Sequence, residues 1–400
     1  MKVSGRCLTF LITATLAFSL GATRALAQQA PSAPRIQFPA PTPNDTLVSP
    51  EVPNDGRVVF RLYAPQATKV SVRGDFITDL QLIFTGVPLT KGDEGIWSFT
   101  TEALPPGAYR YTFVVDGVQT PDPRNPSVSE SLNAPQSLLV VPGLAWEDLQ
   151  DVPHGAVNVV WYHSKALGSW RRMHIYTPPG YNTNSNRYPV LYLLHGGGDN
   201  DNAWSTVGRG GLILDNLIAA KQAEPMIIAM PAGHVASIMR FDPNSMGTDR
   251  FSEDFLQDVM PYVEKNYRAL ADREHTALAG LSMGGIQTLN IGLTNLNRFA
   301  YLGVFSSGWF PQAREKFEKE NTAKLDDAEA KKGLRLFWIG VGKKDIAFEN
   351  SQTTIKTLKE HQFNTEYHES GGFHNWETWR NYLHEFLPRL FHPNAATKAQ

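Results

Sequence analysis

Short, continuously apolar segments in the second half of the chain constrain its fold more than any other feature. They alternate with amphipathic helical patterns such as SEDFLQDVMPYVEKNY, in which Phe255, Val259 and Val263 share one face. Strands that are apolar throughout are typical of parallel sheets buried on both sides. The sequence therefore predicts an α/β domain in which helices cover both faces of a mostly parallel sheet. The apolar segments are PVLYLLH (189–195), PMIIAMP (225–231), TALAG (276–280), YLGVFS (301–306) and LRLFWIG (334–340).

The earlier part of the chain follows a different pattern. Within residues 57–139, segments such as RVVFRLYAP and GAYRYTFVVDG alternate apolar and polar side chains and are separated by turn-rich pieces such as LTKGDEG. This pattern predicts a small all-β, immunoglobulin-like sandwich of antiparallel strands. Trp97 alternates with Phe99 in one of these segments, so we expect it in the core of the sandwich rather than on a binding surface.

These patterns divide the chain, whose 400 residues exceed the usual size of one domain, into two folded domains. A lead-in rich in Pro, Ala, Ser and Gln is expected to be flexible. The α/β domain is expected to open with a hairpin formed by VNVVWYHS and WRRMHIYTPP. The predicted organisation is a signal peptide (1–27), the lead-in (28–50), the sandwich (51–142), a linker (143–154), the α/β domain (155–393) and a tail (394–400).

The first 27 residues are typical of an export signal. Lys2 and Arg6 give a basic start, residues 8–20 are apolar, and Ala25 and Ala27 form a small-residue cleavage site. We therefore expect the mature protein in the periplasm or outside the cell. No other segment is long and apolar enough to cross a membrane, so no membrane contact is expected after cleavage.

Composition excludes several classes of chemistry. The single cysteine, Cys7, lies within the predicted signal, so the mature chain is expected to have neither a disulfide nor a catalytic thiol. The formal net charge of -2 gives no indication of nucleic-acid binding. No two of the 11 histidines have the H-E-x-x-H spacing of a metal site, and we expect neither a metal ion nor an organic cofactor.

The strongest chemical signal is the turn LSMGG, which follows the apolar strand TALAG and precedes a helix. Gly280, Ser282 and Gly284 form a G-x-S-x-G pattern at this strand-to-helix turn, where a strained serine is lifted clear of the sheet. A Cβ at either glycine would strike the neighbouring strand or helix. Ser282 would lie at the helix N-terminus, which favours negative charge. We therefore predict that Ser282 is a nucleophile.

A serine nucleophile needs a base, and the base needs an acid that orients it. Asp345 follows the strand LRLFWIG, and His374 lies on a glycine-flanked loop before the last helix, in the chain order Ser, acid, His. We predict Asp345 as the acid and His374 as the base. Glu349 is an alternative acid, and His368, within the strand TEYHE, is an alternative base with a packing or surface role as the simpler interpretation.

The glycine-rich segment HGGGDN after the strand PVLYLL predicts backbone donors for the oxyanion of acyl transfer. We assign these donors to the N–H groups of Met283 and Gly197, with Gly196 or Gly198 as possible substitutes for Gly197. We expect His195 to support the loop structurally rather than to act as a catalyst.

The second half resembles the esterase D and feruloyl esterase group of α/β-hydrolases, carbohydrate esterase family one. The resemblance extends over roughly residues 155–391 and depends on SKALGSWRRMHIYTPPGY, YPVLYLLHGGGDNDNAW, LAGLSMGG, IGVGKKD and GGFHNWETWRNYLHEFLPRLF. It implies an α/β-hydrolase fold, with nucleophile, base and acid at Ser282, His374 and Asp345, and oxyanion donors at Met283 and Gly197.

The first half resembles the early-set sandwich of family forty-eight carbohydrate-binding modules, through GDF, GIWSFTTEALPPGAYRYTFVVDG and DPRNP. Members of that family commonly have a tryptophan after GDF, whereas this chain continues with ITDLQLIF. Two roles therefore remain open for the sandwich: binding glycan directly, or packing and substrate positioning.

The two resemblances together imply an exported serine esterase that removes feruloyl or another hydroxycinnamoyl group from plant cell-wall polysaccharide, with feruloylated arabinoxylan as the expected partner. Alternatives are an acetyl xylan esterase, a siderophore (enterochelin-type) esterase, or a glycan-binding protein with a degenerate hydrolase domain. Aromatic residues that follow strand ends could form a pocket wall for a flat aryl acid, with ordinary packing as the alternative. They are Trp204, Trp309, Phe310 and Trp376, whereas Trp379 in the final helix is expected to pack.

Overall fold

A computed structural model describes residues 40–235 and 250–392 of the chain. The predicted export signal, more than half of the lead-in and the whole of the predicted tail lie outside these residues. Within the described ranges, no helix is long and apolar enough to span a bilayer.

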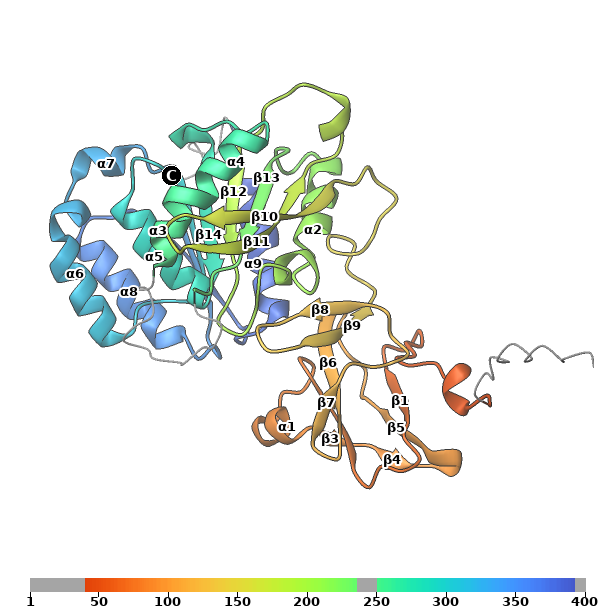
Figure 1. The fold of residues 1–400 in the computed structure, drawn as a ribbon. Helices are drawn as coiled ribbons and strands as arrows, with labels where there is room; N and C mark the ends of the chain where they lie inside the picture. The colour runs from red at the N-terminus through yellow and green to blue at the C-terminus, as the bar shows by residue number, and fades with distance from the viewer. Residues whose placement is uncertain (1–39, 236–249, 393–400) are drawn as a thin grey trace, which may run out of the picture. The chain divides into compact units, whose positions relative to one another are not determined.

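The first domain is a sandwich of two antiparallel sheets, as the alternating pattern predicts (Figure 1). One sheet has the strand order β1-β5-β4, and the other has the order β3-β2-β6-β9-β8, with β7 paired to β6. Trp97 is buried in the core between them. The elements are η1 (Pro43–Asp45), β1 (Val59–Tyr63), β2 (Val70–Gly74), α1 (Leu80–Thr85), β3 (Val87–Pro88), β4 (Thr90–Lys91), η2 (Asp93–Gly95), β5 (Ile96–Thr100), β6 (Gly107–Val115), β7 (Val118–Thr120), β8 (Val128–Glu130) and β9 (Pro135–Val141).

The second domain contains an eight-stranded sheet in the order β10-β11-β13-β12-β14-β15-β16-β17. The predicted opening hairpin forms β10 and β11, which pair antiparallel, and β11 also runs antiparallel to β13. The remaining strands are parallel. The strands are β10 (Ala156–Ser164), β11 (Ser169–Thr177), β12 (Val190–Leu194), β13 (Ile227–Pro231), β14 (Thr276–Leu281), β15 (Tyr301–Phe305), β16 (Leu336–Gly342) and β17 (Glu366–Ser370).

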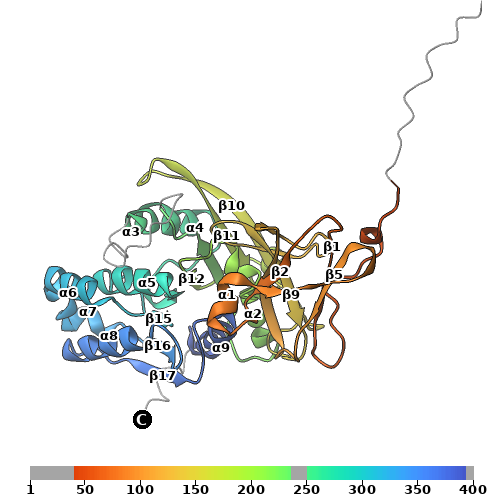
Figure 2. The ribbon, with the colours of Figure 1, turned by 90° about the horizontal axis from the view of Figure 1, so that it is seen from below.

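Helices cover both faces of this sheet, as the fully apolar strands predict (Figures 1 and 2). One core joins the sheet to α3, α4, α5, α6 and α8, and a second core joins its other face to α2 and α9. The helices are η3 (Tyr181–Thr183), η4 (Ala203–Ser205), α2 (Gly210–Ala219), α3 (Phe251–Asp254), the π-helical η5 (Phe255–Val259), α4 (Met260–Asn266), η6 (Arg273–His275), α5 (Met283–Thr294), α6 (Pro311–Leu325), α7 (Ala328–Lys332), α8 (Phe348–Glu360), α9 (Trp376–Phe386) and η7 (Leu387–Arg389).

The architecture is an α/β-hydrolase fold preceded by a β-sandwich. Because the carboxyl ends of parallel strands meet at one edge of a sheet, the segments that follow β12, β14, β16 and β17 lie at the same edge. These segments contain the predicted oxyanion loop, nucleophile, acid and base.

Candidate active site

Ser282 occupies the turn between β14 and α5 in a strained backbone conformation, with φ 52° and ψ -116°. Its N–H donates to the carbonyl oxygen of Phe305 at 2.9 Å. Its own carbonyl oxygen accepts from the Ser307 hydroxyl at 2.6 Å and from the N–H of Gly285 at 2.9 Å. These three bonds hold the strained residue at the N-terminus of α5.

Gly280 and Gly284 permit this turn because there is no room for a side chain at either position. A Cβ on Gly280 would lie 2.4 Å from the backbone of Gly284, and a Cβ on Gly284 would lie 2.6 Å from the carbonyl oxygen of His195. Strand β14, helix α5 and the end of β12 therefore approach one another at backbone distance. The glycines of the G-x-S-x-G pattern have the steric role that the sequence predicts.

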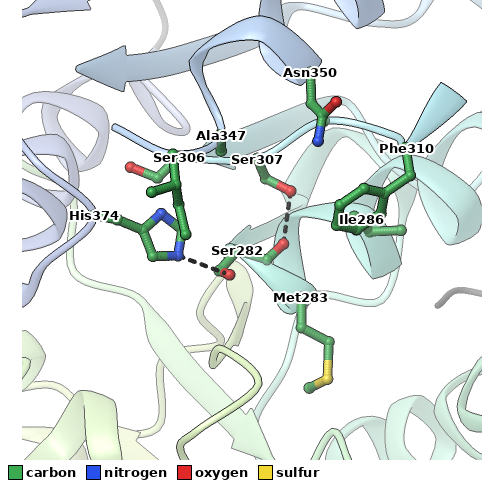
Figure 3. A pocket seen from close by; sticks show the side chains of 11 residues that line it. Ser282, Met283, Ile286, Ser306, Ser307, Phe310, Ala347, Asn350 and His374 are labelled. Atoms are coloured by element: carbon green, nitrogen blue, oxygen red, sulfur yellow. Dashed lines mark hydrogen bonds between the residues drawn. The ribbon is translucent and has the colours of Figure 1, made fainter. Parts of the chain in front are cut away.

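The structure brings the predicted base and acid to Ser282. His374 Nε2 lies 3.0 Å from Ser282 Oγ (Figure 3). His374 Nδ1 lies 2.8 Å from Asp345 Oδ1. Asp345 follows β16, and His374 lies on the loop between β17 and α9. The three side chains, which are 29 to 92 positions apart in the sequence, form one continuous hydrogen-bonded chain.

The environment of Asp345 favours a carboxylate. Burial alone would raise the pKa of Asp345, but the hydrogen bond and charge of His374, the Ser306 hydroxyl and the Ala347 N–H together lower it. The Ala347 N–H donates to Asp345 Oδ1 at 2.7 Å. An ionised Asp345 accepts a hydrogen bond from the Nδ1–H of His374, which keeps the ring proton on Nδ1 and leaves Nε2 free to accept the proton of Ser282.

The two alternative partners lie elsewhere. Glu349 is exposed on α8, and it is Asp345 that bonds to His374. His368 lies on β17, with its Nδ1 3.3 Å from a carboxylate oxygen of Glu385 and its ring stacked on Trp338. His368 therefore has the packing and surface role that was the simpler interpretation.

The predicted oxyanion donors lie beside the nucleophile. Met283 is the first residue of α5, where backbone N–H groups have no partner within the helix. The glycines of HGGGDN follow β12, and a Cβ on Gly196 would lie 3.5 Å from Ser282 Cβ. Gly197 follows Gly196 and is half-buried. The choice of Met283 and Gly197 as donors stays a prediction.

His195 supports the glycine loop from within the protein. Its Nδ1 lies 2.8 Å from the carbonyl oxygen of Gly196, and its Nε2 accepts the N–H of Gly233 at 2.8 Å. The second bond requires Nε2 to be unprotonated, so the proton is on Nδ1. Burial lowers the pKa of His195, which favours this neutral form.

A cavity of about 180 Å³ adjoins Ser282 and His374 (Figure 3). Ile286 of α5, Phe310 and Ile346 form its main apolar lining, and Asn350 of α8 and Ser307 contribute polar groups. Ile346, a large apolar residue of this lining, is 84% exposed. Of these residues, sequence reasoning identified only Phe310. The sequence pattern that places Ser282 and Asp345 after strand ends could also have indicated two further lining residues. They are Ile286, one helical turn beyond Ser282, and Ile346, next to Asp345.

The tryptophans predicted to bind substrate do not line this cavity. Trp204 and Trp376 are buried and pack edge-to-face at 5.1 Å, and Trp376 packs in the same way on Trp379. Trp379 in turn contacts the ring of His374 at 5.1 Å. This cluster packs against the ring of His374 through Trp379. Trp309 is also buried, with its indole N–H donating to Asn290 Oδ1 at 2.8 Å.

The arrangement provides an aligned nucleophile, base and acid, with backbone donors at the expected place for an oxyanion. These are the parts required for acyl transfer through a covalent intermediate. In the part of the chain that the structure describes, no group of three or more His, Cys, Asp or Glu side chains could hold a metal ion.

Comparison with known proteins agrees with this geometry. Residues 164–390 match an esterase family model described as "Putative esterase", and residues 48–128 match the model of carbohydrate-binding module 48, the isoamylase N-terminal domain. An endo-1,4-beta-xylanase/feruloyl esterase of Xylanibacter ruminicola is 30% identical over 86% of this chain and 46% of its own length. The chain thus spans less than half the length of the curated relatives it matches.

Solved structures show the same architecture. A ferulic acid esterase is 26% identical, with a TM-score of 0.52, over 60% of this chain and all of its own. The enterobactin esterase FES of Shigella flexneri is 20% identical, with a TM-score of 0.59, over 84% of this chain and 93% of its own, which shows a shared fold. Because the esterase model matches more than half of the chain and includes all three residues of the hydrogen-bonded chain, this protein belongs to the esterase family of α/β-hydrolases.

Proposed function

We propose that the protein is a serine carboxylic-ester hydrolase whose substrate carries a feruloyl or related hydroxycinnamoyl group on plant cell-wall polysaccharide. The observation that carries this proposal is the continuous Asp345–His374–Ser282 hydrogen-bonded chain beside an open cavity. The similarity to a xylanase/feruloyl esterase and to a ferulic acid esterase supports the choice of acyl group.

The proposed reaction proceeds through an acyl-enzyme. Ser282 Oγ attacks the ester carbonyl carbon while His374 Nε2 takes its proton, and the N–H groups of Met283 and Gly197 stabilise the oxyanion. The bond to the alcohol oxygen then breaks, and His374 returns the proton to the departing sugar hydroxyl. Water attacks the acyl-enzyme, gives its proton to His374, and the acid leaves as Ser282 Oγ takes that proton back.

The cavity favours an aryl acyl group over an acetyl group. A methyl group is close in size to a water molecule, which needs a cavity of only about 10–15 Å³, whereas this cavity measures about 180 Å³. The apolar side chains of Ile286, Phe310 and Ile346 suit a flat ring, and the polar groups of Asn350 and Ser307 suit its hydroxyl and methoxy substituents.

Hydrolysis of methyl ferulate and of nitrophenyl acetate by the full mature chain, each beside Ser282→Ala, tests the proposal. We expect ferulate release that is lost in the variant. Turnover of acetate alone would transfer the assignment to a deacetylase. No Ser282-dependent turnover of either ester would contradict the proposal and direct attention to siderophore esters or to glycan binding.

Export is part of the proposal and has its own test. The basic, apolar and small-residue regions of residues 1–27 support cleavage after Ala27. N-terminal sequencing of the protein recovered from periplasm and medium should begin at Gln28. Recovery of the uncleaved chain from the cytoplasm would contradict export.

A further inference from the structure

The loop that carries Gly197, one of the two predicted oxyanion donors, is bonded to the β-sandwich as well as to the catalytic domain. This segment, residues 195–202, follows β12, and we call it the oxyanion loop. Both β6 and the β8–β9 hairpin of the sandwich contribute bonds to it. The sandwich therefore contacts the loop that carries the predicted oxyanion donor Gly197.

Arg110 of β6 provides the charged contact. Its Nη2 lies 2.7 Å from Asp199 Oδ1 in the loop, and the two side chains are only 9% and 5% exposed. Burial alone would lower the pKa of Arg110, but the charges of Asp199 and Asp75 outweigh it and raise that pKa. The guanidinium also lies 5.6 Å from the ring centre of Trp376, beside the His374 loop. A buried pair of this kind is costly to separate, so it fixes the position of Asp199.

Asp199 controls the turn that contains the predicted donor. Its N–H donates to the carbonyl oxygen of Gly196 at 3.2 Å, which closes a tight turn around Gly197. Gly196 is the residue that approaches Ser282, as the 3.5 Å separation of a Cβ placed there shows. Movement of Asp199 would therefore move Gly197 relative to the nucleophile.

The β8–β9 hairpin holds the remainder of the loop. The N–H of Leu132 donates to the carbonyl oxygen of Gly198 at 3.1 Å. Glu130 accepts from the Asn200 amide at 3.0 Å, and its N–H donates to Asn202 Oδ1 at 3.0 Å. Consecutive parts of the oxyanion loop are thus bonded to one strand pair of the sandwich.

We infer that Arg110 is a positioning residue for ester hydrolysis, and that the sandwich sets the oxyanion loop through it. The inference rests on the proposed function. Oxyanion donors act only when they lie about 2.7–3.1 Å from the developing charge, and a misplacement of about 1 Å can cost on the order of a hundredfold in rate. The sandwich is then part of the active-site framework and not only an appended module.

Arg110→Met in the full-length chain tests this role, because methionine is long and apolar but lacks the charge. With methyl ferulate we expect kcat to fall about tenfold or more while KM stays within about twofold, because the cavity that holds the acyl group is untouched. Arg110→Lys should recover part of the loss. Asp199→Asn should lower kcat in the same way, and the double variant should be no slower than Arg110→Met alone, since both remove one interaction.

Two further variants distinguish an altered position of the oxyanion loop from a general loss of stability. Asn216→Ala in α2 removes an amide that donates to the carbonyl oxygens of Ala145, Trp146 and Asp148, so it weakens the attachment of the linker without touching the oxyanion loop. It should lower the free energy of unfolding and leave kcat unchanged. Leu132→Pro removes the donor to Gly198 and should lower kcat severalfold.

The outcomes distinguish this inference from the proposed function. A wild-type chain that hydrolyses no ester defeats the proposed function itself. If the wild type is active, a folded Arg110→Met with kcat within twofold of wild type overturns the inference, as does an equal loss of kcat in Asn216→Ala. If Arg110→Met does not fold, an unchanged kcat in a folded Asp199→Asn overturns it, because this variant removes the same interaction.

Discussion

Asp345 shows how one buried residue determines the chemistry of the site. Its side chain is fully buried, and one of its oxygens accepts from both His374 and the Ala347 N–H. Asparagine has the same shape but carries an amide that can donate to His374 Nδ1, which would place the ring proton on Nε2. A histidine protonated at Nε2 cannot accept the proton of Ser282.

We therefore predict that Asp345→Asn lowers kcat by about ten-thousandfold with little change in KM. Steady-state kinetics on an aryl ester measures both values. Glu349→Gln is the matched control, because Glu349 is the neighbouring exposed carboxylate on α8, and it should keep wild-type kcat. A large loss in the control, or a modest one in Asp345→Asn, would return the acid role to Glu349.

The lowered pKa of Asp345 also predicts an acid-dependent stability. A carboxylate whose pKa in the folded state lies below its ordinary value of 3.8 binds fewer protons when folded, so it stabilises the fold above that value and loses this effect as pH falls. The free energy of unfolding of Asp345→Asn should therefore fall below wild type at pH 7, and the gap should narrow below about pH 4. Denaturant titrations of both proteins from pH 7 down to about pH 2 measure the gap; a gap that stays constant over this whole range would refute the linkage.

At the scale of elements, the contact between β14 and α5 depends on the absence of side chains. A Cβ on Gly280 would meet backbone atoms of Gly284 at 2.4 Å, and backbone cannot move aside as a flexible side chain can. We predict that Gly280→Ala lowers the free energy of unfolding by about 1–3 kcal/mol, as overpacking does, and slows ester hydrolysis by moving Ser282. Gly371→Ala is the control for stability, because no atom lies within 4 Å of a Cβ at that exposed position. Equal stability of the two variants would contradict the steric argument.

Most elements could be predicted from the sequence because their signals are local. The fully apolar runs are the buried parallel strands, and the alternating segments form the sandwich. The positions of Ser282, Asp345 and His374 follow strand ends, and the topology brings all strand ends of this kind to one edge. The same reasoning does not separate the buried residues Trp204, Trp309 and Trp376 from those that line the cavity, because a position after a strand does not determine which way a side chain faces.

At the scale of the whole molecule, sequence patterns could not predict the contacts that hold the sandwich and the catalytic domain together, because these contacts join residues far apart in the chain. Arg380 of α9 bonds through Nε to Glu147 at 2.6 Å and through Nη1 to the carbonyl oxygens of Ala108 and Val207 at 2.9 and 3.2 Å. The charged partners lie 233 positions apart, and each side chain is 1% exposed. No periodic pattern in the sequence indicates that Arg380 and Glu147 contact each other. Arg380 thus joins the catalytic domain to the linker through a buried ion pair with Glu147, and to the sandwich through the carbonyl oxygen of Ala108.

This contact predicts that the domains unfold together. Arg380→Met would leave Glu147 buried without its partner, and breaking such a pair costs about 3–5 kcal/mol. Adding Glu147→Gln removes the unpaired buried charge, so the double variant should recover part of the lost free energy of unfolding. Denaturant unfolding followed separately by probes in each domain should give one shared transition in the wild type and a lower midpoint for both probes in Arg380→Met. A midpoint that moves for only one domain would show instead that the sandwich is an independent unit, and would weaken the view that it supports the active site.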